Sequence, residues 1–139
     1  MKRIIFFVGT VILLSACAGG KAPADKQMVG NDKDEHGCIG SAGYVWSEVR
    51  NDCIRLFENG VAVKSIDNAD EVAYVVLSQD SLKAQLFYSG EDKHKVLSRT
   101  GDSQKGYIWY STENNPTIKL ENNKWTITIK GETKFEQAK

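Results

Sequence analysis

The stretch EVAYVVLSQDSLKAQLFYS, residues 71–89, decides the fold class. Its first half is rich in β-branched and aromatic residues. Its second half alternates between two sets of side chains, Leu82, Ala84, Leu86 and Tyr88 against Lys83, Gln85 and Phe87. A period of two residues is typical of a strand that turns one face toward a core. Because the Gln-Asp-Ser between the halves favours a turn, the stretch predicts two antiparallel strands.

The same pattern continues on both sides of this stretch. Further strands are predicted at 61–66, 96–99, 106–112, 117–121 and 125–131, with a last short strand within 132–137. Turn sequences separate them about every eight to twelve residues, as in all-β domains. We therefore expect a mainly β protein whose residues 61–139 form one antiparallel β domain, either a small barrel or a sandwich.

The preceding segment, GCIGSAGYVWSEVRNDCIRLFENG (37–60), permits two interpretations. Trp46, Val49, Cys53 and Leu56 have helical spacing, which would suit a short helix. However, aromatic residues alternate before Ser47, and the Asn-Asp at 51–52 is typical of a turn between returning strands. We favour a hairpin over a helix for this segment.

The N-terminus has the pattern of a secretory signal over residues 1–16. Lys2 and Arg3 precede an apolar run over 4–14, and small residues follow it. That run is too short to span a bilayer, which takes roughly 20 residues of helix. The signal predicts export from the cytoplasm.

The end of this signal, Leu14-Ser15-Ala16-Cys17, resembles the lipobox of bacterial lipoproteins. The resemblance implies cleavage before Cys17, a diacylglycerol on its sulfur and an acylated new N-terminus, which together would anchor the protein to a membrane. Residues 17–36 are small, polar and charged, and we expect a flexible tether there. Ala18 does not resemble an inner-membrane retention signal, so we expect an outer-membrane location.

With Cys17 assigned to lipid attachment, Cys38 and Cys53 remain. In an oxidising compartment, two cysteines of a small domain usually form a disulfide, and we expect one here. The alternative is a metal site of Cys38 with His36, which would need further ligands at suitable spacing.

Charge and motifs exclude several functions. The chain has 18 basic and 18 acidic residues, and loss of Lys2 and Arg3 with the signal leaves a mature net charge of about −2. A chain without a basic excess is unsuited to nucleic acid. The sequence lacks a nucleophile with a recognisable base and the common metal and phosphate motifs. We therefore expect no enzyme activity, no metal and no cofactor. A hydrolase acting through Asp102 or Glu113 is a weaker alternative.

The most aromatic predicted strand contains Tyr107, Trp109 and Tyr110. Tyr107 and Trp109 should point to one face, and Ile108 and Tyr110 to the other. One pair must belong to the core, and the other would suit a protein or sugar partner if it is exposed. Both faces could instead be covered.

Residues 70–136 resemble the membrane-bound inhibitors of c-type lysozyme in the order of their strands, from VAYVVLSQDSLKAQLFYSGE to the closing WTITIKG. The resemblance implies a small antiparallel barrel whose loop serine and later lysine enter the lysozyme cleft. The chain has Ser103-Gln104-Lys105-Gly106-Tyr107, with the glycine displaced. Glu113 stands where the lysine is expected, and it would repel the catalytic acids of a lysozyme.

These patterns predict a lipid-anchored binding protein of the cell envelope, with a protein partner such as a lysozyme or another envelope component. The candidate partner contacts are Ser103, Lys105, Tyr107 and Trp109. The alternative is a structural or assembly lipoprotein without a ligand pocket.

Overall fold

The computed structural model describes residues 32–89, 94–101, 106–112 and 116–137. Their order is a 3-10 turn η1 (Gly40–Ala42), a hairpin, a one-turn helix α1 (Leu56–Asn59) and eight further strands. The hairpin strands are β1 (Tyr44–Ser47) and β2 (Asp52–Arg55). The others are β3 (Val61–Ser65), β4 (Val72–Leu77), β5 (Lys83–Phe87), β6 (Lys95–Thr100), β7 (Tyr107–Tyr110), β8 (Pro116–Glu121), β9 (Lys124–Ile129) and β10 (Glu132–Glu136).

The eight strands β3 to β10 form a closed antiparallel barrel in which each strand pairs with the next. Closure comes from β10 and β3, where Phe135 lies opposite Ser65 and Glu136 opposite Lys64. The prediction of a mainly β fold is confirmed. Of the two predicted architectures, the structure has the barrel and not the sandwich. Closure also leaves the strands of this sheet without an open edge.

Tight turns join several of the strands. Asn122 and Asn123 have φ of 50° and 62°, and Lys130 and Gly131 have φ of 52° and 84°. Positive φ at both central positions is the geometry of a type I′ turn, which matches the twist of paired strands. The predicted strand 125–131 therefore ends at Ile129, because its last two residues form a turn.

The barrel interior is filled by one apolar cluster drawn from every barrel strand. Its buried members are Val63, Ala73, Val75, Ala84, Leu86, Leu97, Trp109, Ile118, Trp125, Ile127 and Phe135. The alternation predicted for residues 82–88 holds at Ala84 and Leu86, whereas Leu82 is exposed at the start of the strand.

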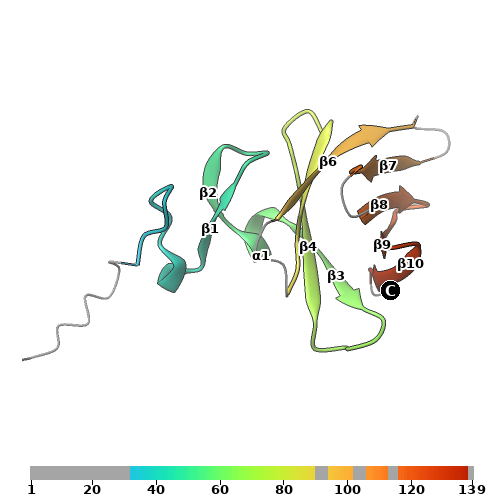
Figure 1. The fold of residues 1–139 in the computed structure, drawn as a ribbon, viewed down its shortest axis with the longest axis horizontal. Coiled ribbons are helices and arrows are strands. Elements are labelled where there is room, and N and C mark those ends of the chain that lie inside the picture. The colour runs from blue at the N-terminus through green and yellow to red at the C-terminus, as the bar shows by residue number, and fades with distance from the viewer. Residues whose placement is uncertain (1–31, 90–93, 102–105, 113–115, 138–139) are drawn as a thin grey trace, which may run out of the picture.

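The hairpin packs against the outside of the barrel, where Figure 1 shows it joined to the barrel through α1. The prediction of a hairpin is confirmed, and the helix is limited to the single turn after β2. Ile54 of β2 packs with Val76 and Phe87 of the barrel in a second apolar cluster. Strand β5 is therefore buried on both faces from Ala84 to Phe87.

A buried hydrogen bond fixes the position of the hairpin on the barrel. The Ser47 hydroxyl lies 3.0 Å from Gln85 Oε1, and both residues are buried. The Arg50 amide N–H also donates to Ser47 Oγ, at 3.3 Å. A buried polar group that loses its hydrogen-bond partner keeps the cost of desolvation without a compensating interaction.

We expect Ser47→Ala to lower the free energy of unfolding by about 1–3 kcal/mol, because it leaves the Gln85 amide without this partner. Urea unfolding measures the change, and Ser98→Ala, at an exposed position of β6, is the matched control. Gln85→Leu should lower the free energy of unfolding by less in the Ser47→Ala protein than in wild type, because the hydrogen bond is already absent there. Strictly additive effects would show that the two side chains do not interact.

Candidate functional site

Of the four predicted partner contacts, the structure describes Tyr107 and Trp109. Trp109 is 1% exposed, stacks on Trp125 at 5.4 Å between ring centroids, and donates its Nε1–H to the Ser81 carbonyl at 3.1 Å. The structure thus assigns Trp109 to the core and not to an accessible binding surface. Tyr107 is half-buried under the Arg99 guanidinium, 4.9 Å from its ring centroid.

The aromatic side chain of β7 that reaches the surface is Tyr110, which is 47% exposed. Ser103, Lys105 and Glu113 lie outside the described residues, as does Cys17 with the whole signal. Along the chain, Ser103 precedes β7 and Glu113 follows it.

A groove of about 950 Å³ lies between the N-terminal segment and the barrel. One wall comes from residues 32–40 and from β1, and the other from β5, the start of β6 and Ser111. The lining residues are Asp32, Lys33, Asp34, Glu35, His36, Cys38, Gly40, Tyr44, Val45, Trp46, Glu48, Gln85, His94, Lys95, Val96 and Ser111.

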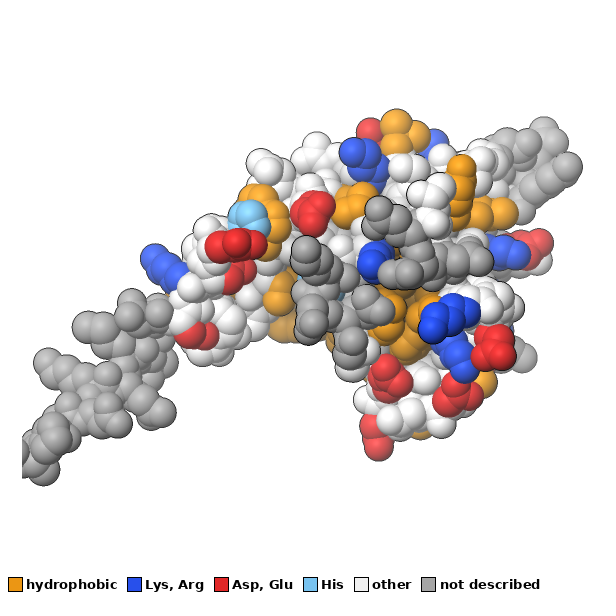
Figure 2. All heavy atoms as spheres, in the orientation of Figure 1, with side chains coloured by type: hydrophobic (Ala, Val, Ile, Leu, Met, Phe, Trp, Pro, Cys, Tyr) orange, Lys and Arg blue, Asp and Glu red, His pale blue; other side chains and the backbone are white. Residues whose placement is uncertain are grey.

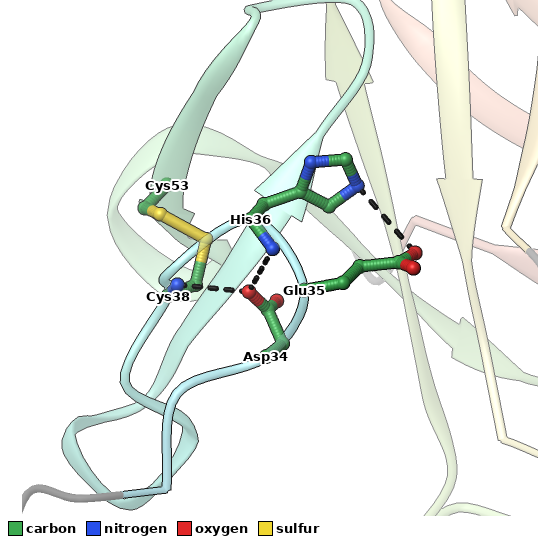
Figure 3. Close-up of polar contacts among 5 residues, drawn as sticks. All are labelled: Asp34, Glu35, His36, Cys38 and Cys53. Carbon is green, nitrogen blue, oxygen red and sulfur yellow. Dashed lines mark hydrogen bonds and ion pairs between the residues drawn. A yellow bond between two sulfur atoms is a disulfide. The ribbon is translucent and has the colours of Figure 1, made fainter.

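Residues 32–38, which form part of one wall of this groove, fold into a turn whose polar contacts are drawn in Figure 3. The Asp34 carboxylate accepts hydrogen bonds from the backbone N–H groups of His36 at 2.9 Å and of Cys38 at 2.8 Å. Lys33 forms a β-bridge with Ile39. Within the expected tether over 17–36, the residues Lys33, Asp34 and His36 therefore take part in a folded turn.

The disulfide between Cys38 and Cys53 ties this turn to β2 and confirms the predicted pairing. A sulfur in a disulfide is not available as a thiolate ligand, so the alternative of a Cys38–His36 metal site is wrong. No group of three histidine, cysteine or acidic residues that could hold a metal ion occurs within the described ranges.

Acidic side chains outnumber lysines around the groove. Asp32, Asp34, Glu35 and Glu48 line it together with Lys33 and Lys95. Figure 2 shows acidic side chains and a histidine gathered over the hairpin part of this face. With the histidines counted as neutral, the described lining residues therefore carry four negative and two positive charges.

Both histidines of the protein line the groove, one on each wall. His36 stacks on Trp46 with 4.3 Å between ring centroids and an interplanar angle of 11°. His94 packs on Phe87 at 4.2 Å, and its Nδ1 is buried without a hydrogen-bond partner among the described residues. Desolvation lowers the pKa of His94, and the nearby charge of Glu48 opposes that shift.

We expect acidification to destabilise the protein through His94. Since its pKa is lower in the folded chain than the ordinary 6.5, the unfolded chain binds more protons just below that pH. Stability should fall as the pH drops from 6.5 toward the folded pKa. Unfolding midpoints at about pH 7 and about pH 5.5 measure the loss, which should be smaller in His94→Gln. An equal loss in both proteins would contradict the assignment.

A second, smaller hollow of about 330 Å³ lies at the barrel end that carries the β3–β4 and β9–β10 turns. Tyr88, Ile129 and Phe135 line it below a charged rim. Lys134 of the rim contacts Glu132 at 3.0 Å and Asp67 at 3.2 Å, and these two contacts raise its pKa. The rim thus neutralises part of its own charge.

Sequence reasoning missed the groove. Its walls come from segments about 50 residues apart, and no local motif joins them. The available signal was Phe87, an aromatic residue on the face of β5 opposite to the predicted core. An apolar side chain there indicates that another element covers the outer face.

No family model matches the chain, and no similar protein was found among curated proteins or among solved structures. Among the described residues, no helix is long and apolar enough to cross a membrane.

Proposed function

We propose that this protein is a lipid-anchored, non-catalytic binding protein of the cell envelope, located at the outer membrane. The observation that carries the binding role is the groove, a large open hollow built by a disulfide-tied hairpin on a rigid closed barrel. Recognition sites are commonly concave and lie between two packed units. The groove favours a binding role over the alternative of a structural lipoprotein without a ligand pocket.

The anchor rests on the lipobox-like Leu14-Ser15-Ala16-Cys17. Fourteen residues separate Cys17 from Asp32, the first described residue and part of the groove wall. Even fully extended, this segment reaches at most about 50 Å. An anchored protein would therefore present the groove close to the membrane surface.

The anchor is tested by mass analysis and fractionation of the protein made in its own cells. We expect a chain that begins at Cys17 and carries acyl groups, and we expect Cys17→Ser to move the protein from the membrane fraction to the soluble fraction. An uncut and unacylated wild-type chain would disprove the envelope assignment.

The specific form of the proposal is a protein that resembles the inhibitors of c-type lysozyme. A small antiparallel barrel is the fold that the resemblance implies, which supports this form. The glutamate Glu113, at the position where the resemblance implies a lysine, weakens it. Cell-wall hydrolysis by a c-type lysozyme, followed with the protein in excess, tests it directly. Undiminished hydrolysis would remove the inhibitor and leave an envelope partner, which crosslinking in cells would identify.

A further inference from the structure

The groove runs along the free edge of the hairpin. Strand β1 pairs with β2 on one side, from Tyr44 opposite Arg55 to Ser47 opposite Asp52. Tyr44, Val45 and Trp46 of β1 line the groove, whereas β2 contributes none of the described lining residues. The groove therefore follows the edge of β1 that β2 leaves unpaired.

At this edge, the backbone groups of Trp46 are available for pairing. The Tyr44 N–H points away from β2 and donates to the Ile39 carbonyl at 3.2 Å. Because the backbone groups of successive residues alternate between the two edges of a strand, those of Trp46 point to the same edge. Within the described chain, Trp46 has no backbone partner there. An unpaired edge of this kind is a template for an added strand.

The charge of the groove selects the kind of segment that can pair there. Glu48, next to the end of β1, is exposed and forms no ion pair within the described ranges. The Glu35 side chain, on the wall formed by residues 32–40 and β1, is 89% exposed and lies 3.7 Å from His36 Nε2. An acidic wall repels nucleic acid and anionic lipid headgroups, and it attracts lysine and arginine side chains.

We infer that the groove binds an extended peptide segment with basic side chains, which adds as a strand to the free edge of β1. Backbone hydrogen bonds at Trp46 provide the pairing, and Glu48 and Glu35 select the charge. The pairing centres on Trp46, because the outward N–H of Tyr44 already donates to the Ile39 carbonyl. The inference rests on the proposed function and names the chemistry of the partner that the groove takes.

The test measures binding of a dye-labelled peptide of three Lys-Val repeats by fluorescence anisotropy. The full mature chain is used in a non-ionic detergent. In an extended strand the lysines of this peptide share one face, so either register presents them together. We expect saturable binding, and we expect a peptide of three Glu-Val repeats not to bind. Methylation of alternate backbone nitrogens should abolish binding, since it removes the strand hydrogen bonds but keeps the charge.

Two variants separate the groove from general attraction. Glu48→Lys should weaken binding at least about tenfold, because it places a like charge beside the peptide. Asp70→Lys, an equal change of charge at an exposed turn outside the groove, should have little effect. Trp46 is the only half-buried tryptophan, so its fluorescence should change on binding and Trp46→Phe should remove that change.

Three results would overturn the inference. One is the absence of saturable binding of the Lys-Val peptide. Another is an equal loss of peptide affinity in Glu48→Lys and Asp70→Lys. The third is binding that appears only after deletion of residues 18–31 or after dilution of a dimer, which would make the chain itself the occupant. The acylation and fractionation experiments do not depend on the groove. A negative peptide-binding result therefore leaves the anchor proposal intact, and a chain without acyl groups leaves the groove inference intact.

Discussion

Replacing Trp109 by alanine is expected to lower the free energy of unfolding by about 3–5 kcal/mol. The indole is almost fully buried between barrel strands, where it stacks on Trp125 and donates a hydrogen bond to the Ser81 carbonyl. Its removal leaves a cavity and an unsatisfied carbonyl near one end of the barrel. Since small domains are stable by about 5–15 kcal/mol, this loss is a large share of the total. Urea unfolding followed by circular dichroism measures it.

Two further variants make this result interpretable. Tyr110→Ala, at the exposed next position of β7, should change stability by less than about 1 kcal/mol. Trp109→Phe keeps a large ring but loses the N–H, so it should fall between wild type and Trp109→Ala. If Trp109→Ala unfolded at the wild-type urea concentration yet lost partner binding, Trp109 would be a contact residue and its place in the core would be wrong.

Removing the disulfide with Cys38→Ala and Cys53→Ala together is expected to release the hairpin while the barrel stays folded. The bond closes a loop of 15 residues, which corresponds to about 3 kcal/mol in the chain-entropy account. A two-stranded hairpin is marginal by itself, and β1 and β2 pair only with each other. The contacts of Ile54 and Ser47 with the barrel would then have to hold the hairpin alone.

Amide hydrogen exchange resolves this effect along the chain. Protection should fall over residues 38–55 and remain in β6 to β9, which touch neither cysteine. Peptide binding should be lost together with this protection, because the turn 32–38 and β1 form one wall of the groove. Reduction of the wild-type protein is the matched control and should give the same pattern. Unchanged protection in β1 and β2 would show that packing alone holds the hairpin.

The expectations that depend on local pattern agree with the structure. Alternation placed Ala84 and Leu86, and Trp125 and Ile127, on the core face, because a strand exposes successive side chains to opposite sides. Turn residues separated the strands correctly, apart from Lys130 and Gly131, which form a turn of their own. The disulfide followed from counting cysteines once Cys17 was assigned to lipid attachment.

The functional residues were harder to predict, and β7 shows why. Its two faces carry Tyr107 and Trp109 on one side and Ile108 and Tyr110 on the other, so hydrophobicity does not distinguish the core face from the outer face. The curvature and closure of the barrel decide that Trp109 points inward. Phe87, on the face of β5 opposite to the predicted core, was a signal that another element covers that face, but the sequence did not say which element.

By itself, then, the sequence determined the strands, their turns and the cysteine pair, because each depends on residues that are close along the chain or on simple counting. Only the tertiary structure decided that the sheet closes through β10 and β3, that the hairpin docks over β4 and β5, and that both histidines line one groove. These features depend on contacts between distant segments. A two-residue period specifies which side chains share a face, but it carries no information about the element that will pack against them.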